Sequence, residues 1–211
     1  MGIVGPVTMN SLLAKRGNER GLTDLVEQPE LVMEVGTRAA INRAKALIQT
    51  GSDLLYIGDA ASFCFVISPR HFREYCLPYY QRFVEALRPL DKPIYLHICG
   101  HVRPIVDTMV ESGPDCIEPL DPLGGMTVAE FRARVGSRTA LMGAVNTLTL
   151  AGGTAEDVRR EAVECIQAGG QNGGYILAAG DMVPNEAPAV NVAELCRTAR
   201  RFSYEPLLNF D

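Results

Sequence analysis

Two side chains that bind transition metals, His97 and Cys99, stand two residues apart in the segment LHICG. Residues two apart in a β-strand point to the same face, so we expect the imidazole and the thiol to lie side by side on one strand. Imidazole and thiolate together favour Zn2+, and catalytic zinc commonly has three protein ligands and an open position. The pattern therefore indicates a zinc site whose third ligand comes from another strand, with Asp181 and Asp121 as the candidates.

The same pair also has a purely structural interpretation. His97 would then be a core histidine that hydrogen-bonds a neighbouring carbonyl group, and Cys99 a small buried apolar residue. A His-x-Cys pattern is short, and its spacing alone leaves both interpretations open.

Polar residues also close the other short apolar runs of the sequence. In barrels and open α/β sheets, active sites gather at the carboxyl ends of the strands, which is where these residues fall. We expect hydrogen-bonding groups of a substrate pocket among them, and Asp121 could instead hydrogen-bond the imidazole of His97. Capping of a turn is the alternative role for the aspartates. The candidate catalytic residues are Asp59, His97 and Asp181; the candidate substrate-binding residues are Asp59, Asp121 and Asn146; the candidate metal ligands are His97, Cys99 and Asp181.

The elements that must position these residues alternate along the chain. Apolar runs suited to buried strands cover Ile3–Thr8, Leu54–Asp59, Ile94–Cys99, Cys116–Leu120, Ala140–Asn146 and Tyr175–Gly180. Helical patterns cover Pro29–Thr50, Ser68–Arg88, Arg103–Ser112, Thr127–Val135, Thr154–Ala168 and Val190–Phe202. This alternation predicts an α/β protein with a parallel sheet, and no linker divides residues 1–211, so we expect a single domain. Six strand–helix units are fewer than the eight of a barrel, which leaves an open sheet or a barrel without its first two units.

Composition excludes several classes of function. The chain has 211 residues, of which 47% are hydrophobic and 21% charged, and a net charge of −5. These values are those of a globular protein, and the acidic balance argues against nucleic-acid or anionic-membrane partners. The apolar runs are too short to cross a bilayer, and no signal peptide is visible, so we expect a cytoplasmic protein with six reduced cysteines. No nucleotide-binding glycine loop and no nucleophile elbow occurs.

Several segments, in this order, resemble the uroporphyrinogen decarboxylase superfamily. They are Gly58–Ala60, Ser68–Tyr79, Leu96–Gly100, Met142–Asn146 with Gly153–Thr154, and Gly173–Leu177. The resemblance runs from about Ile3 to Phe202. It implies a (β/α)8 barrel of which this chain holds roughly the last six units, and it would explain the shortfall of strands.

Within that superfamily the likeness is nearer to the cobalamin-dependent methyltransferases, which pass methyl groups from corrinoid proteins to thiols such as coenzyme M. Their zinc is held by a His-x-Cys pair, matched here by His97 and Cys99, and by a later cysteine. Asp181 stands at the place of that cysteine, and a carboxylate can also bind zinc. The resemblance implies zinc as cofactor, methylcobalamin as methyl-donating substrate and a corrinoid protein as partner, with the zinc making the acceptor thiol a thiolate.

Two other hypotheses about the function stay open. Uroporphyrinogen III decarboxylase of porphyrin biosynthesis has a histidine at the place of Asp181 and a tyrosine at the place of Leu12. It needs arginines for a polycarboxylate, whereas the arginines seen here, such as Arg70, Arg73 and Arg103, lie mostly at helix starts. The non-enzyme reading is an inactive remnant or a binding module. It would be completed by a missing N-terminal segment, by another chain or by homo-oligomerisation, because open strand edges are costly.

Overall fold

A computed structural model describes residues 2–4, 9–171 and 173–202 of the chain. The chain divides into two compact units, Met1–Ile117 (unit 1) and Glu118–Asp211 (unit 2). Of the expected first strand, Gly2–Val4 forms β1, and positions 5–8 lie outside the described residues. The single domain over residues 1–211 stays a prediction.

The strands of unit 1 are parallel and follow one another in chain order. β1 pairs with β2 (Leu55–Gly58), and β2 pairs with β3 (Ile94–His97) in a register that sets Gly58 opposite His97. Burial alternates along β2 and β3, so one face is fully buried and the other half-buried. The half-buried face is the one that carries the polar side chain of His97.

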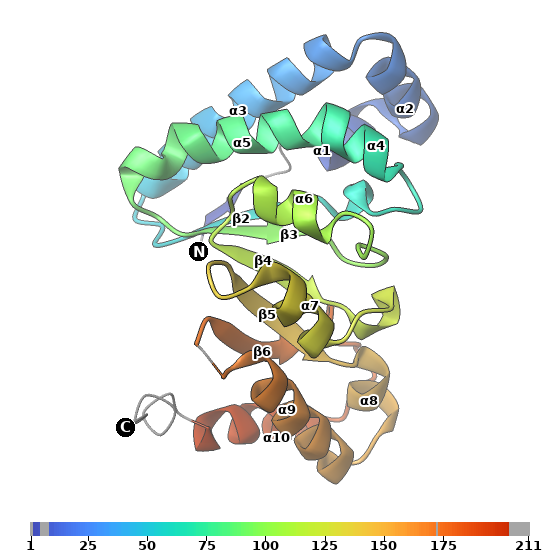
Figure 1. Cartoon of the computed structure of the whole chain (residues 1–211), viewed down its shortest axis with the longest axis vertical. Coiled ribbons are helices and arrows are strands. Elements are labelled where there is room, and N and C mark those ends of the chain that lie inside the picture. The colour runs from blue at the N-terminus through green and yellow to red at the C-terminus, as the bar shows by residue number, and fades with distance from the viewer. Residues whose placement is uncertain (1, 5–8, 172, 203–211) are drawn as a thin grey trace. The chain divides into compact units, whose positions relative to one another are not determined.

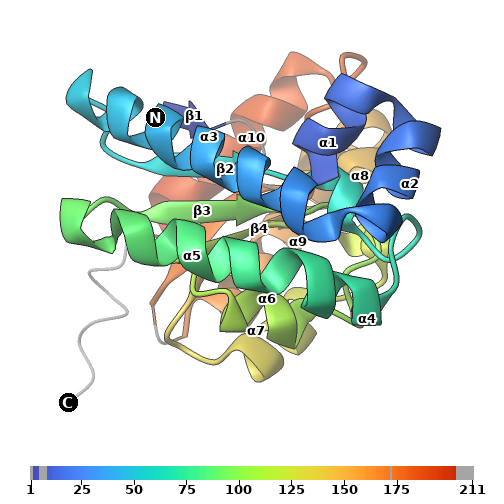
Figure 2. The ribbon, with the colours of Figure 1, turned by 90° about the horizontal axis from the view of Figure 1, so that it is seen from above.

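Helices cover unit 1, and α3 and α5 run alongside each other (Figures 1 and 2). The expected helix from Pro29 is confirmed, with proline in the first turn, where its missing N–H costs nothing. Two helices before it, of eight and ten residues, were not predicted because they are short. The helices are α1 (Met9–Arg16), α2 (Asn18–Glu27), α3 (Pro29–Gln49), η1 (Ala60–Ser62), α4 (Pro69–His71), α5 (Leu77–Leu87), η3 (Arg88–Leu90) and α6 (Val106–Glu111).

The segment expected as one helix over Ser68–Arg88 is helical but not uniform. The Ser68 hydroxyl accepts a hydrogen bond from the N–H of His71 over 3.1 Å, as an N-cap does. A π-helical stretch, η2 (Phe72–Cys76), then separates α4 from α5. Pro78 in the first turn of α5 has no N–H and crowds the carbonyl group four residues before it, which accounts for the widened turn.

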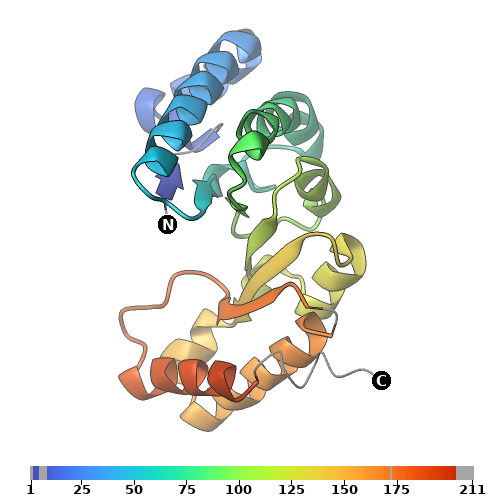
Figure 3. The ribbon, with the colours of Figure 1, turned by 90° about the vertical axis from the view of Figure 1, so that its left-hand side faces the viewer.

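Unit 2 repeats the alternation of strand and helix. β4 (Cys116–Leu120) contains the boundary between the units, and β5 (Ala140–Val145) pairs in parallel with β6 (Tyr175–Ala179). Thr127 and Thr154, the first residues of two expected helices, form capping boxes with Glu130 and Asp157 three positions further on. α9 and α10 lie side by side (Figure 3). The helices are η4 (Pro122–Gly124), α7 (Val128–Val135), α8 (Thr147–Gly152), α9 (Ala155–Gly169) and α10 (Ala189–Arg201).

The core of each unit is built from strand residues on one face and helix residues that pack on them. Leu55, Ile57, Ile94 and Leu96 of unit 1 are at most 1% exposed. In unit 2 the core includes Phe131, Leu141, Val145, Leu150 and Val158. Among the described residues, no helix combines the length and the apolar character that crossing a membrane requires.

Candidate functional site

Asp59 follows β2 directly and is fully buried. Its Oδ2 accepts hydrogen bonds from the Ser62 hydroxyl over 2.7 Å, from the backbone N–H of Met9 over 3.3 Å and from the Tyr80 hydroxyl. The carboxylate thereby connects the end of β2 with the start of α1 and with α5. These contacts give Asp59 a structural function, and its catalytic and substrate-binding roles stay predictions.

His97 closes β3, and Cys99 lies two residues further on. Both are half-buried, whereas Leu96 and Ile98 are at most 1% exposed. This alternation is the one that the sequence predicts for an imidazole and a thiol on a shared face. Gly100 then turns the chain with φ +81°, a conformation that favours glycine, and a Cβ there would come within 3.2 Å of the Phe63 ring.

The connection after β2 lies against the connection after β3. The Cys64 N–H donates to the His101 carbonyl oxygen over 3.0 Å, and the imidazole of His101 stacks on the Phe65 ring with centroids 5.1 Å apart. Phe65 is nonetheless 80% exposed. Burial raises the pKa of the Cys64 thiol, which disfavours its reactive thiolate form. His101 is half-buried, and the apolar run SFCFV is the signal in the sequence for its aromatic stacking partner.

In unit 2, the three candidate residues follow three successive strands and are all half-buried. Asp121 Oδ1 accepts from the Leu123 N–H over 2.8 Å, and Asn146 Oδ1 accepts from the Leu148 N–H over 2.9 Å. Asp181 Oδ1 accepts from its neighbour's N–H over 2.8 Å. Each side chain thus supports a local turn with one oxygen, and each carboxylate has a second oxygen with which it could bind a ligand.

The loops that carry these residues come together within unit 2. A Cβ at Gly180 would lie 2.5 Å from Cδ of Pro122 and 3.3 Å from the carbonyl oxygens of Leu120 and Val145. The Gly180 N–H also donates to the Val145 carbonyl oxygen over 2.7 Å. Only glycine fits at this point, and it lets the end of β6 approach the ends of β4 and β5.

Charge at the strand ends is sparse. Of the connections that follow β2 to β6, all of which are described, only the one after β3 holds a lysine or arginine, Arg103. The connections after β4 and β6 instead carry Asp121, Asp181 and Glu186. An anion with many carboxylates would meet few cations on these loops.

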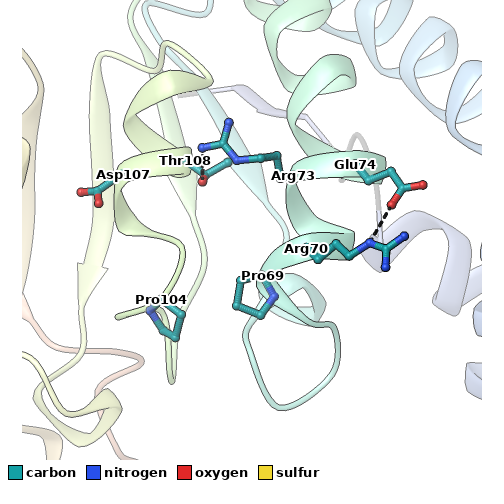
Figure 4. Close-up of a pocket in the computed structure, with 7 residues that line it drawn as sticks. All are labelled: Pro69, Arg70, Arg73, Glu74, Pro104, Asp107 and Thr108. Carbon is teal, nitrogen blue, oxygen red and sulfur yellow. Dashed lines mark hydrogen bonds and ion pairs between the residues drawn. The ribbon is translucent and has the colours of Figure 1, made fainter.

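A separate surface pocket of about 550 Å3 lies between the starts of α4 and α6 in unit 1 (Figure 4). Arg73 donates to the Thr108 hydroxyl over 3.1 Å and pairs with Glu111 at 2.8 Å, and Arg70 pairs with Glu74 at 3.6 Å. Both guanidinium groups are thus paired with carboxylates, so the pocket is a poor anion site. Its lining residues are Pro69, Arg70, Arg73, Glu74, Pro104, Asp107 and Thr108.

Comparison with known proteins assigns the chain to a family. The family model described as Uroporphyrinogen decarboxylase (URO-D) matches residues 1–202. The methylcobamide:CoM methyltransferase MtaA of Methanosarcina barkeri is 28% identical over 199 residues, which are 92% of this chain and 55% of that protein. The chloroplastic uroporphyrinogen decarboxylase of Zea mays is 28% identical over 214 residues, 97% of this chain and 52% of that protein.

A solved structure, a methyltransferase from Methanosarcina mazei, has a TM-score of 0.75 and 24% identity over 85% of this chain and 52% of its own. This likeness confirms the α/β barrel fold, of whose eight units the described residues hold six strands. The chain spans about half the length of the relatives that it matches. The expected superfamily and the likeness to its methyltransferase branch are confirmed, and the chain belongs to the uroporphyrinogen decarboxylase (URO-D) family.

Proposed function

We propose that this chain carries the metal-binding part of a zinc-dependent methyltransferase that moves a methyl group from a corrinoid to a thiol. The observation that carries the proposal is the half-buried pair of His97 and Cys99 at the carboxyl end of β3, where barrel enzymes have their active sites. The methylcobamide:CoM methyltransferases among the relatives support the choice of reaction. A corrinoid protein would be the partner that presents the methyl donor.

The residues present fit zinc. Imidazole nitrogen, thiolate sulfur and carboxylate oxygen are its three common ligand types, and His97, Cys99 and Asp181 offer one of each. The carboxyl ends of all strands face one mouth in a barrel, so ligands from β3 and from the loop after β6 could serve one ion. Asp121 is the reserve ligand, or a hydrogen-bond partner of the imidazole.

Bound zinc would supply a thiolate at neutral pH, because a coordinated thiol loses its proton far more readily than a free one. In the transfer, the thiolate sulfur forms a bond to the methyl carbon, and the carbon–cobalt bond breaks with its electron pair left on cobalt. Asn146 would hydrogen-bond the substrate beside the reacting groups. Asp59 would contribute by fixing the end of β2.

Decarboxylation of uroporphyrinogen is less well supported by the same residues. Such a substrate carries many carboxylates, whereas Arg103 is the one lysine or arginine in the described connections after β2 to β6. Arg70 and Arg73 are paired with carboxylates on the helices. The strand-end loops therefore suit a less anionic substrate.

The decisive experiment is the metal content of the purified protein by plasma mass spectrometry, in wild type and in Cys99→Ala. We expect about one zinc per chain in the wild type and its loss in the variant. Cys64→Ala is the matched control, since it removes a half-buried thiol from the neighbouring loop and should keep the zinc. The absorbance of methylcobalamin, followed with 2-mercaptoethanesulfonate as acceptor, then tests the transfer.

The outcomes separate the alternatives. If the protein binds zinc but transfers no methyl group, the metal site is supported and the proposed reaction is rejected. A wild type without zinc would reject the metal site and favour the decarboxylase or the binding module. A dimer or larger assembly in size-exclusion chromatography would favour a module that another chain completes.

A further inference from the structure

The aromatic ring of Tyr56 lies against the imidazole of His97. The two ring centroids are 5.4 Å apart and the planes meet at 48°. Both residues belong to unit 1 and to the half-buried face of its strands. The contact therefore concerns the side chain proposed as a metal ligand and a neighbour that the proposed function does not use.

The register of β2 and β3 does not place Tyr56 directly opposite His97. Tyr56 is opposite Tyr95 in the pairing of β2 with β3, and His97 is opposite Gly58. To reach His97, the Tyr56 side chain must lean along its own strand, over Gly58. A Cβ built on Gly58 would lie 3.1 Å from Cε1 of Tyr56, which places the ring directly above that glycine.

Gly58 matters here through the space it leaves. Its φ is outside the positive range, so its backbone does not require glycine. Any side chain at this position would push the Tyr56 ring by a few tenths of an ångström and would stand opposite the imidazole. In the segment LYIG, the missing side chain of Gly58 thus leaves the space in which the Tyr56 ring contacts His97 of the next strand.

The backbone of His97 is fixed independently. Its carbonyl oxygen accepts a hydrogen bond from the Asp59 N–H over 2.9 Å. The hydrogen bond to the backbone does not set the rotation of the imidazole, because the torsion about the Cβ–Cγ bond has a broad energy profile, and a ring packed against the imidazole restricts that rotation. A metal ion needs one ring nitrogen in a fixed direction, and neighbours that orient a ligating histidine change metal affinity strongly.

We propose that Tyr56 is a positioning residue that holds the imidazole of His97 in its metal-binding orientation, and that Gly58 provides the space for this contact. The inference rests on the proposed function for its metal, but the ring contact itself does not depend on the metal.

The test compares Tyr56→Leu, Tyr56→Phe and Gly58→Ala with wild type in zinc affinity, measured by competition with a chromophoric chelator. Tyr56→Leu should weaken zinc binding by about 10- to 100-fold, as the loss of a partner that orients a ligating histidine does. Tyr56→Phe keeps the ring and should stay near wild type, and Gly58→Ala should fall between them. Tyr95→Leu is the matched control, because it removes a ring from the same face and should keep the affinity. Urea unfolding of each variant verifies that it is folded.

A second readout needs no metal. The His97 ring protons of the zinc-free protein, observed by NMR, should lose the ring-current shift from Tyr56 in Tyr56→Leu and keep it in Tyr56→Phe. If wild type binds no zinc, the proposed function fails, and this spectrum alone decides the positioning role. Unchanged His97 resonances in Tyr56→Leu would overturn the inference, as would equal losses of affinity in Tyr56→Leu and Tyr56→Phe.

Discussion

The backbone N–H of Asp59 donates a hydrogen bond to the carbonyl oxygen of His97 over 2.9 Å. This bond extends the ladder between β2 and β3 beyond the pair of Gly58 and His97. Asp59 is itself held by the hydroxyl groups of Ser62 and Tyr80. The buried carboxylate of Asp59 thus anchors the residue whose N–H is bonded to the backbone of the candidate metal ligand.

Asp59→Asn should therefore destabilise the protein. The amide cannot accept three hydrogen bonds as well as a carboxylate does, and we expect a loss of about 1.5–3 kcal/mol in the free energy of unfolding, measured with urea. Asp53→Asn is the control, because Asp53 is exposed two residues before β2, and it should change that free energy by less than about 0.5 kcal/mol. Equal stability of Asp59→Asn and wild type would show that the network contributes nothing.

The sequence predicted most strands and longer helices because their apolar periods and caps are local signals. The capping boxes at Thr127 and Thr154 are two clear examples. The alternating burial from Leu96 to Cys99 also agrees with the expected pattern, although β3 itself ends at His97 and Cys99 lies just beyond the strand. These features depend on residues that are close in the chain.

The partners of Asp59 could not be predicted in this way. Tyr80 is 21 residues away and Met9 is 50 residues away, so only the tertiary fold brings them to the carboxylate. The position of the Tyr56 ring over Gly58 likewise depends on the rotamer of Tyr56, which the periodicity of a strand does not predict. Local patterns in the sequence predict the fold, whereas the contacts of Asp59 with Tyr80 and Met9 and of Tyr56 with His97 join residues that are far apart in the chain.

Asp181→Ala tests the third metal ligand. If the carboxylate binds zinc, its removal should weaken zinc binding at least about 10-fold, because a direct ligand matters no less than the residues that orient one. Glu186→Gln removes a neighbouring exposed charge and should leave the affinity unchanged. Competition with a chelator measures all variants. If Asp121→Ala weakens zinc binding and Asp181→Ala does not, Asp121 and not Asp181 is the third zinc ligand.

The cysteines should react with iodoacetamide in an order set by burial. Cys196 is exposed and should be alkylated first. Burial, followed by the charge of Glu161, raises the pKa of Cys165 to about 11, so at pH 8 this thiol is protonated as well as inaccessible. Mass spectrometry of peptides from a time course gives the rates. The two rates should converge in urea, and equal rates in the folded protein would contradict the burial of Cys165.

Asp157 should make the stability of unit 2 depend on pH in the acid range. Its Oδ2 accepts from the Thr154 hydroxyl over 2.6 Å and from the Thr154 N–H over 3.0 Å, and its Oδ1 pairs with Arg160 at 2.8 Å. These contacts, the Thr154 hydroxyl first, lower the pKa of Asp157 from 3.8 to about 2. A lowered pKa in the folded state means that the stabilisation is present above about pH 4 and is lost as the pH falls towards 2.

The measurement is the free energy of unfolding of wild type and Asp157→Asn between pH 2 and 6, together with an NMR titration of the Asp157 carboxyl carbon. The difference between the two proteins should be largest above pH 4 and should shrink towards pH 2. Thr154→Ala should raise the pKa of Asp157 more than Arg160→Gln does, because the hydroxyl is the largest cause of the shift. A difference in stability that is constant with pH would mean that the carboxylate charge does not stabilise the start of α9.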